Sequence, residues 1–314
     1  MINQITDTIM MVRPAAFLMN EETAVNNFYQ QKVEGTSPSE IQNRALAEFD
    51  GFVEKLRGNG IKILVIQDTA ESKTPDSIFP NNWNSFHEDG AVYLYPMFAE
   101  NRRREIKPTI LDQLTQDFEI KSIHSFTHWE ATDHFLEGTG SMILDRPNKL
   151  IYAALSERTQ MPVLKDLSER SGFELVTFTA NQTVDSRRLP IYHTNVMMCL
   201  GEGFAVICLD SIDDENEKNM VREKLNETGK EIIEISEDQC NQFAGNMLQV
   251  RNEGGKRFIV MSASAYHSLN SVQVKTLSSY GDLIHHSLAT IEKYGGGSAR
   301  CMMAEIFLQP KHKL

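Results

Sequence analysis

Three reactive side chains stand far apart in this sequence: a carboxylate at Glu137, an imidazole at His193 and a thiol at Cys301. A thiolate attacks carbon, an imidazole moves protons near neutral pH, and a carboxylate orients the imidazole or binds a substrate N–H. Together they are the groups needed for acyl-type chemistry through a thiol-bound intermediate. Singly, each has a structural explanation as a core thiol, a structural histidine or a turn glutamate.

The surroundings of Cys301 favour a reactive thiol. Three glycines, 295–297, come shortly before it, and glycine permits positive φ and the close approach of another group. We expect Cys301 to be the first residue of a strand, 301–307, and to face a pocket. Arg300 beside it is expected to favour the thiolate by its positive charge.

A repeat in the chain explains how such distant residues could meet. A pattern of strand, polar segment, hairpin and helix recurs about five times, with a period of roughly 50 residues. The strand at 9–18 and the strand at 301–307 each lack a partner, and pairing them would close a ring without open edges. The sequence therefore predicts an α/β fold of repeated ββαβ units closed into a ring, as one domain over residues 1–314.

Each repeat has a small or polar residue just before its inner hairpin strand. In a closed ring these points meet at the axis, so a site there would draw residues from every repeat. Glu137, His193 and Cys301 lie at or near three of them, which is the strongest indication of function. The five positions are Asn82, Gly140, Asn195, Asn246 and Ala299.

The motifs at these points resemble the guanidino-group-modifying superfamily, which includes arginine deiminases, dimethylarginine hydrolases, amidinotransferases and succinylarginine dihydrolase. The similarity covers almost the whole chain in family order, and the pattern most resembles the branch described as citrulline-utilisation hydrolases. The family segments Phe-x-Arg-Asp, Leu-Glu-Gly-Gly-Asp, His-x-Asp and Arg-Cys-Met are similar to Phe79-Pro-Asn-Asn82, Leu136-Glu137-Gly138, His193-Thr-Asn195 and the end of Gly297–Met302.

The resemblance implies a five-bladed α/β propeller, the pentein fold. It also implies Cys301 as nucleophile, His193 as proton shuttle and Glu137 as supporting carboxylate, with no metal and no organic cofactor. Arg158 lies in a Ser-Glu-Arg-Thr segment similar to one whose arginine holds the substrate carboxylate, and Arg102 is a second candidate for that role. Phe79 is a candidate for the pocket wall, although core packing explains it equally well.

Two departures from the family pattern bear on the substrate. The two aspartates that clamp a guanidinium in the family are replaced by Asn82 and Asn195 in this chain. An aspartate pair suits a cation through charge-assisted hydrogen bonds, whereas asparagines offer neutral donors and acceptors and suit a ureido group. The pair could also suit a guanidinium more weakly, since the succinylarginine dihydrolase branch carries asparagines and acts on an arginine-type substrate.

We therefore expect a hydrolase of a non-peptide C–N bond, with citrulline as the first substrate. The alternatives are a deiminase or dihydrolase of an arginine derivative, and an amidinotransferase. A non-catalytic binding protein of the same fold is the alternative from another class. Such a protein need not keep a cysteine, a histidine and a glutamate together, and this chain has all three.

Composition limits the partners. The chain has 314 residues and a formal net charge of −12, which argues against a nucleic acid or an anionic membrane. No apolar run is long enough to span a bilayer and no secretory signal is seen, so a cytoplasmic protein with reduced thiols is expected. We expect a small amino acid as the partner, and self-association is left open. We interpret His124, His128 and His134 as residues of an irregular loop rather than metal ligands.

Overall fold

One strand arrangement recurs throughout the structure, a computed structural model that describes residues 2–31 and 35–311. These residues form five three-stranded sheets and a separate two-stranded hairpin. In every three-stranded sheet the central strand pairs antiparallel with one neighbour and parallel with the other. The α/β class expected from the sequence is therefore confirmed.

The strands are short, and within each sheet they pair with their neighbours in the following order. They are β17 (Ala304–Glu305), β1 (Thr8–Arg13) and β2 (Lys62–Gln67); β3 (Asn84–Phe86), β4 (Ala91–Leu94) and β5 (Ser122–Ser125); β6 (Ile143–Asp145), β7 (Leu150–Ala154) and β8 (Glu174–Phe178); β11 (Met198–Leu200), β12 (Phe204–Ile207) and β13 (Glu231–Glu234); β14 (Leu248–Arg251), β15 (Arg257–Ser262) and β16 (Asp282–His286); and the hairpin β9 (Asn181–Val184) with β10 (Arg187–Pro190).

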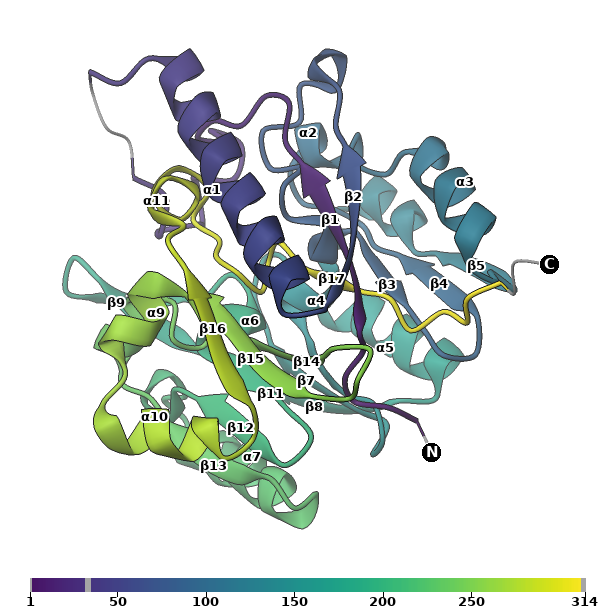
Figure 1. Cartoon of the computed structure of the whole chain (residues 1–314). Coiled ribbons are helices and arrows are strands. Elements are labelled where there is room, and N and C mark those ends of the chain that lie inside the picture. Colours follow the sequence, from purple (N-terminus) through teal and green to yellow (C-terminus); the bar gives the residue numbers. More distant parts are fainter. Residues whose placement is uncertain (1, 32–34, 312–314) are drawn as a thin grey trace.

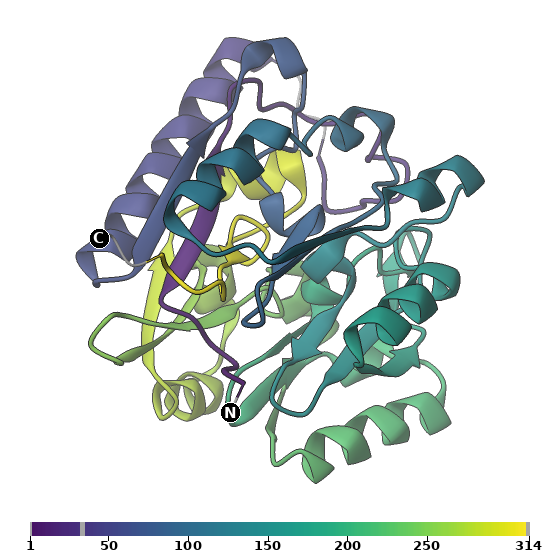
Figure 2. The same ribbon diagram turned by 90° about the vertical axis from the view of Figure 1, so that its right-hand side faces the viewer.

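The helices lie mostly on the outside of the molecule, around the strands (Figures 1 and 2). They are α1 (Pro38–Gly58), α2 (Glu100–Arg103), α3 (Pro108–Asp117), α4 (Gly138–Ser141), α5 (Met161–Ser171), α6 (Thr194–Met197), α7 (Glu215–Glu227), α8 (Glu237–Asn241), α9 (Ala263–Ser268), α10 (Ser271–Ser278) and α11 (Ala289–Gly295), with 3₁₀ turns at η1 (Ala70–Ser72), η2 (Pro80–Asn82), η3 (Thr127–Thr132) and η4 (Leu209–Ser211).

A helical crossover joins the two parallel strands of every three-stranded sheet, because a tight turn cannot connect parallel neighbours. In the first sheet the crossover is α1, which begins after Ser37, whose side chain accepts the N–H of Glu40. Its apolar residues recur every three or four positions, so one face of the helix is buried against the sheet. That face consists of Ile41, Ala45, Phe49, Phe52, Val53 and Leu56.

The two ends of the chain meet in the first sheet. Strand β17 pairs antiparallel with β1 in the register Ile9↔Glu305 and Met10↔Ala304, as expected from the two unpartnered strands. Figure 1 shows yellow β17 crossing beside purple β1. This pairing brings the turn that carries Cys301 next to the first repeat.

The starts of the inner strands differ from expectation. The predicted strand 301–307 is reduced to the two residues of β17, and Cys301 lies in a turn where its N–H donates to Ser298 O at 3.0 Å. The segments before β3, β6 and β11 are likewise short helical turns, η2, α4 and α6. Their backbone groups pair within the turn, as Ser141 N does with Glu137 O at 3.1 Å, and so cannot extend the sheet.

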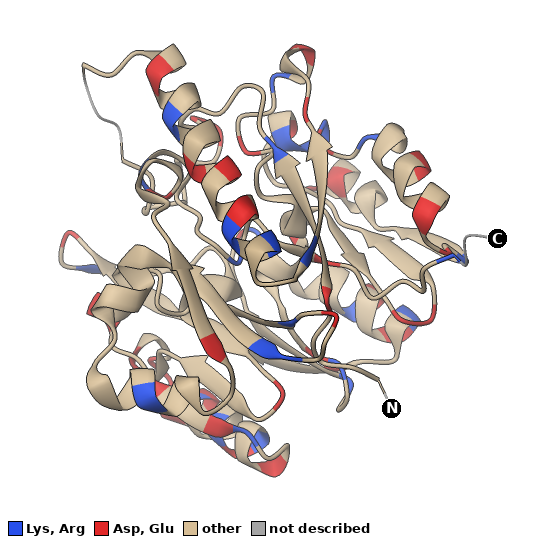
Figure 3. Ribbon diagram, viewed as in Figure 1, with Lys and Arg blue, Asp and Glu red and all other residues tan. Residues whose placement is uncertain are grey.

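Acidic and basic side chains alternate on the outer helices, as on α1 and α7 in Figure 3. None of the helices in the described part of the chain is long and apolar enough to cross a bilayer.

Candidate active site

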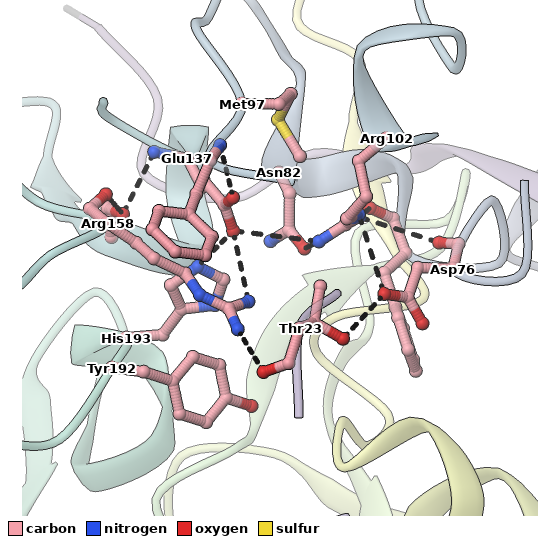
Figure 4. A network of polar contacts seen from close by, with 12 residues as sticks. Thr23, Asp76, Asn82, Met97, Arg102, Glu137, Arg158, Tyr192 and His193 are labelled. Carbon is pink, nitrogen blue, oxygen red and sulfur yellow. Dashed lines mark hydrogen bonds and ion pairs between the residues drawn. The ribbon is translucent and has the colours of Figure 1, made fainter. Parts of the chain in front are cut away.

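The helical turns before the inner strands bring most of the predicted site residues together (Figure 4). Glu137 lies at the centre of the group, with its Oε2 2.7 Å from His193 Nε2. The same oxygen is 3.5 Å from Arg158 Nη1 and 3.6 Å from Arg102 Nη1. Arg102 in turn donates to Asn82 Oδ1 at 2.8 Å. Residues from three repeats thus share one buried network.

Glu137 is held as a carboxylate inside the protein. Burial alone would raise its pKa, but Arg158, the hydrogen bond with His193 and Arg102 outweigh burial and hold that pKa well below its ordinary value. Its second oxygen accepts the backbone N–H of Phe98 at 3.0 Å. The carboxylate is therefore ionised at neutral pH and fixed in position.

His193 is poised as a base. Burial lowers its pKa to about 4, although Glu137 opposes the shift, so the ring is neutral near pH 7. Because the Glu137 carboxylate can only accept, the ring must donate from Nε2, which leaves Nδ1 as an acceptor without a hydrogen-bond partner in the part of the chain that the structure describes. Gly140 leaves room for that side of the ring, since a Cβ there would come within 2.8 Å of Nδ1.

The thiol of Cys301 is contacted by two side-chain amides. Asn195 Nδ2 and Asn246 Nδ2 each lie 3.3 Å from Sγ. Asn246 also accepts Arg300 N at 3.0 Å and donates to Asn195 O at 2.9 Å, so one buried side chain ties the Cys301 turn to the Asn195 turn. The sequence placed Asn246 at an equivalent point of the repeat but did not select it as a site residue.

Arg300 forms an ion pair with Glu305. Its guanidinium donates to Glu305 Oε2 and to Met303 O, each at 2.8 Å. The role of its charge in favouring the Cys301 thiolate stays a prediction, and the pairing of that charge with Glu305 gives it no support. The amides of Asn195 and Asn246 are the polar groups that reach the sulfur.

Arg158 is covered by the segment that follows β1. Its Nε donates to Asn26 Oδ1 and its Nη2 to Thr23 O, each at 2.8 Å. Its guanidinium lies over the ring of Tyr192, 4.9 Å from the centroid. A substrate carboxylate bound at Arg158 would have to displace the contacts with residues 23–26.

Arg102 is held more tightly than expected for a substrate ligand. It forms a bidentate pair with Glu105, with distances of 2.9 and 3.0 Å, besides its bond to Asn82. Its Nη2 also lies 3.4 Å from Phe79 O. Every nitrogen of this guanidinium is engaged within the protein, so Arg102 fixes Asn82 and supports Glu137.

Asp76 is a buried carboxylate that the sequence analysis did not select. Its Oδ2 accepts Asn20 Nδ2 at 2.7 Å and Thr23 Oγ1 at 3.3 Å and lies 3.8 Å from Arg102 Nε, while its Oδ1 has no hydrogen-bond partner among the described residues. Burial raises its pKa. In the sequence, only its position three residues before Phe79 could have marked Asp76 as a site residue. That indication is weak, because an acidic residue in a loop is usually exposed to solvent.

Phe79 explains much of the glycine run before Cys301. A Cβ on Gly295 or Gly297 would come within 2.8 or 2.9 Å of its ring. The glycines therefore let the Phe79 ring pack against the segment that leads to the thiol. Phe79 is itself buried, so it packs beside the site rather than lying open to solvent.

The histidine-rich stretch is more ordered than expected. His124 lies in β5 and His128 in η3, so the prediction of an irregular loop is wrong for these two, whereas His134 lies outside any helix or strand. Within the described residues, no group of three or more His, Cys, Asp or Glu side chains could hold a metal ion.

Comparisons with known proteins indicate the family of the chain. A family model described as N,N dimethylarginine dimethylhydrolase, eukaryotic, matches residues 13–308. No curated protein sequence matches the chain significantly.

Several solved structures share the fold. The chain is similar to ArgZ, an arginine dihydrolase from the ornithine-ammonia cycle in cyanobacteria, with a TM-score of 0.73 and 16% identity over 97% of this chain. It spans only 41% of that protein, but 99% of its N-terminal domain, whose product-bound structure matches with a TM-score of 0.72 and 18% identity over 96% of this chain.

A mutant dimethylarginine dimethylaminohydrolase, solved as an adduct with S-methyl-L-thiocitrulline, is also similar, with a TM-score of 0.62 and 13% identity over 98% of this chain and 100% of that one. At these identities the solved structures show a shared fold. The family model, by contrast, covers most of the sequence. The chain thus belongs to the N,N-dimethylarginine dimethylhydrolase family of hydrolases, within the guanidino-group-modifying superfamily expected from its motifs.

Proposed function

We propose that the chain hydrolyses a C–N bond in the side chain of a guanidino or ureido amino acid through a covalent intermediate on Cys301. Two observations carry the proposal: the buried contact of a neutral His193 with an ionised Glu137, and the buried thiol of Cys301 held by two amides. The arginine dihydrolase and the dimethylarginine dimethylaminohydrolase with which the chain shares its fold support the substrate class.

In the proposed reaction His193 Nδ1 accepts the thiol proton of Cys301, and the thiolate attacks the carbon of the substrate group. The C–N bond breaks, and His193 returns its proton to the departing nitrogen. Water then gives a proton to His193 and adds to the thiol-bound carbon, which releases the product and the thiol. Glu137, 2.7 Å from Nε2, stabilises the charged ring in each step.

The balance of buried charge supports a guanidino substrate. Three carboxylates, Asp76, Glu105 and Glu137, face two guanidinium groups, Arg102 and Arg158. Burial raises the pKa of Glu105 to about 7, but its bidentate contact with Arg102 is that of a carboxylate. A cationic side chain would offset the excess negative charge, whereas the neutral side chain of citrulline would not.

The two asparagines support the same order of preference. Asn82 Nδ2 donates to Asn81 Oδ1 at 3.0 Å, and Asn195 Nδ2 donates to Cys301 Sγ. One N–H of each amide is therefore engaged, while Asn195 Oδ1 is a buried acceptor with no partner among the described residues. A guanidinium offers only N–H donors, so we place arginine first. Citrulline, expected first from the asparagines alone, stays the alternative, as does the citrulline-utilisation branch.

We propose that the substrate backbone binds beside this group. Arg158 would hold the carboxylate, and the unpartnered Oδ1 of Asp76 would accept the ammonium group. Arg158 and Tyr192 also line a cavity of about 220 Å³, together with Val25, Phe28 and neighbouring residues, which offers an approach to Arg158.

We also propose that the chain forms one closed ring and a single domain. The five three-stranded sheets of the described residues would be the blades of one closed ring, and residues 1–314 a single domain, although residues 1, 32–34 and 312–314 lie outside the described residues. The shared strand order and the pairing of β1 with β17 support it. A site built from several repeats is what such a ring would produce.

The test is ammonia release from arginine, citrulline, agmatine and N-succinylarginine at equal concentrations. We expect arginine to react fastest, and agmatine poorly because it lacks the carboxylate. A kcat/KM for citrulline about tenfold above that for arginine, roughly 1.4 kcal/mol, would restore the ureido interpretation. Release of no ammonia from any of the four would contradict the proposed preference for arginine and for any substrate without an N-alkyl group.

A further inference from the structure

Four arginine side chains are more than nine-tenths buried among the described residues, and they differ in one respect. Arg102, Arg158 and Arg300 each have a carboxylate oxygen within 3.5 Å. Arg146, which is only 3% exposed, has none within 4 Å in the described part of the chain. A charge of this kind is almost never fully buried unless it is paired, and Arg146 lacks the close ion pair that the other three have, since Glu305 and Glu88 act on its charge only from farther away.

The contacts of Arg146 do not replace a counter-ion. Its guanidinium lies 4.0 Å from the centroid of the Phe307 ring, and its Nη1 is 3.5 Å from His87 Nδ1. Burial and the nearby Arg146 charge keep the pKa of His87 well below its ordinary value, so this ring is neutral. The backbone N–H of Arg146 donates to Gln4 Oε1 at 2.9 Å. This bond fixes the main chain and does not involve the guanidinium.

Arg146 lines a cavity of about 340 Å³. This volume lies within the usual range for small-ligand sites, roughly 300–1,000 Å³. The cavity is formed by the β3–β4 and β6–β7 turns with Phe173 and Phe307, so it lies at the opposite end of these hairpins from Asn82 and Glu137. None of the residues assigned to the active site lines it.

The lining carries charges of both signs beside apolar walls. Lys149 adds a second cation near Arg146, while Glu88 and Asp89 add carboxylates from the facing turn. Ile2, Phe173 and Phe307 supply apolar surface. A planar guanidinium binds a carboxylate with two parallel hydrogen bonds, and acidic residues opposite it favour an ammonium group over a dianion.

We propose that the Arg146 cavity binds the carboxylate of a small zwitterion of the free α-amino acid class, at a site separate from Cys301. Arg146 holds the carboxylate, Glu88 and Asp89 face the ammonium group, and the aromatic walls contact the side chain. This proposal does not depend on the reaction at Cys301.

The test is binding calorimetry on the full chain with four probes. L-Leucine carries both charged groups, isovalerate only the carboxylate, isopentylamine only the ammonium, and inorganic phosphate is the dianion. We expect L-leucine to bind, isovalerate to bind more weakly and isopentylamine not to bind. Binding of phosphate without L-leucine or isovalerate would overturn the assignment, as would no binding by any probe.

Substitutions locate the site. Arg146→Met should weaken L-leucine binding at least about tenfold, roughly 1.4 kcal/mol. Arg158→Ala, which removes the expected carboxylate ligand of the active site, should leave the affinity for L-leucine unchanged. If Arg146→Met does not fold, Lys149→Glu, at an exposed position, replaces it in the test. It should weaken L-leucine binding several-fold. Loss of binding in Arg158→Ala but not in the other two would assign the L-leucine site to the active centre and contradict the proposal.

Discussion

Two buried cationic regions at opposite ends of the same hairpins differ in how their charge is compensated. Around Glu137 the guanidinium groups of Arg102 and Arg158 share a carboxylate and further hydrogen bonds. Around Arg146 the guanidinium contacts an aromatic face and a neutral imidazole, and the carboxylates of Glu305 and Glu88 act on its charge from farther away. Charge at the Glu137 end is therefore part of a network whose members depend on one another, whereas Arg146 forms no ion pair within 4 Å among the described residues.

The largest difference should appear in turnover. Cys301→Ser and His193→Ala should each lower kcat by about 10³-fold or more, because groups that act as a unit lose most of the rate when one is removed. Steady-state kinetics with the best substrate, beside circular dichroism of each variant, would measure this. Cys199→Ala, in strand β11, is the matched control and should retain near-native kcat. Near-native activity in Cys301→Ser would contradict the assignment.

The free energy of unfolding should show the next largest difference between the Glu137 region and the Arg146 region. Glu137→Gln leaves Arg158 without a carboxylate within 4 Å in the described structure, so we expect a loss of about 3–5 kcal/mol in the free energy of unfolding. Arg146→Met removes an unpaired charge and should change stability by about 1 kcal/mol or less, or increase it. Urea unfolding of both variants makes the comparison. Equal losses would show that Arg146 is compensated after all.

The pH dependence of stability follows from His193. Its pKa in the folded protein is about 4, below the ordinary value of 6.5, so between these values the unfolded chain binds more protons. Stability should therefore fall as pH drops from about 6.5 to 4, with up to roughly 3 kcal/mol from this group. His193→Gln should flatten that part of the profile in urea unfolding at stepped pH. An unchanged slope in this variant would mean that His193 is not buried as a neutral ring.

The smallest effect is expected at the amides that contact Cys301. Asn246→Ser removes one of two donors to Sγ, so alkylation of the thiol by iodoacetamide at a fixed pH should slow by about tenfold or less. Asn195→Ser should slow it similarly, whereas Arg300→Gln should have a smaller effect, because that charge is paired with Glu305. A larger effect of Arg300→Gln than of Asn246→Ser would support the role first expected for Arg300. Peptide mass mapping would assign the alkylated thiol in each case.

The repeat explains what the sequence could predict. Because equivalent points of a repeated unit meet when the two ends of the chain pair, Glu137 and His193 could be placed together, and Asn195 beside Cys301, without any side-chain detail. Contacts made by rotation of a side chain could not be predicted this way. The pairing of Arg300 with Glu305 and the bridge through Asn246 depend on the turn at Cys301, where a strand was expected.

Substrate preference was the least predictable part. The asparagine pair suggested free donors for a ureido oxygen, but one N–H of each amide already bonds to Asn81 or Cys301. The buried Asp76 that changes the charge balance lies in a loop, where neither period nor motif marks it. The net charge of a site depends on which distant groups are buried with it, and that is a property of packing.

The proposed mechanism depends on a covalent bond between Cys301 and the substrate carbon. Acid-quenched reactions with arginine, digested and analysed by mass spectrometry, would detect that bond. We expect a mass increase on the peptide containing Cys301 that appears during turnover, disappears when substrate is exhausted, and persists longer in His193→Ala if the adduct forms there. Turnover without any adduct on that peptide, or an adduct on Cys199, Cys208 or Cys240 instead, would contradict the mechanism.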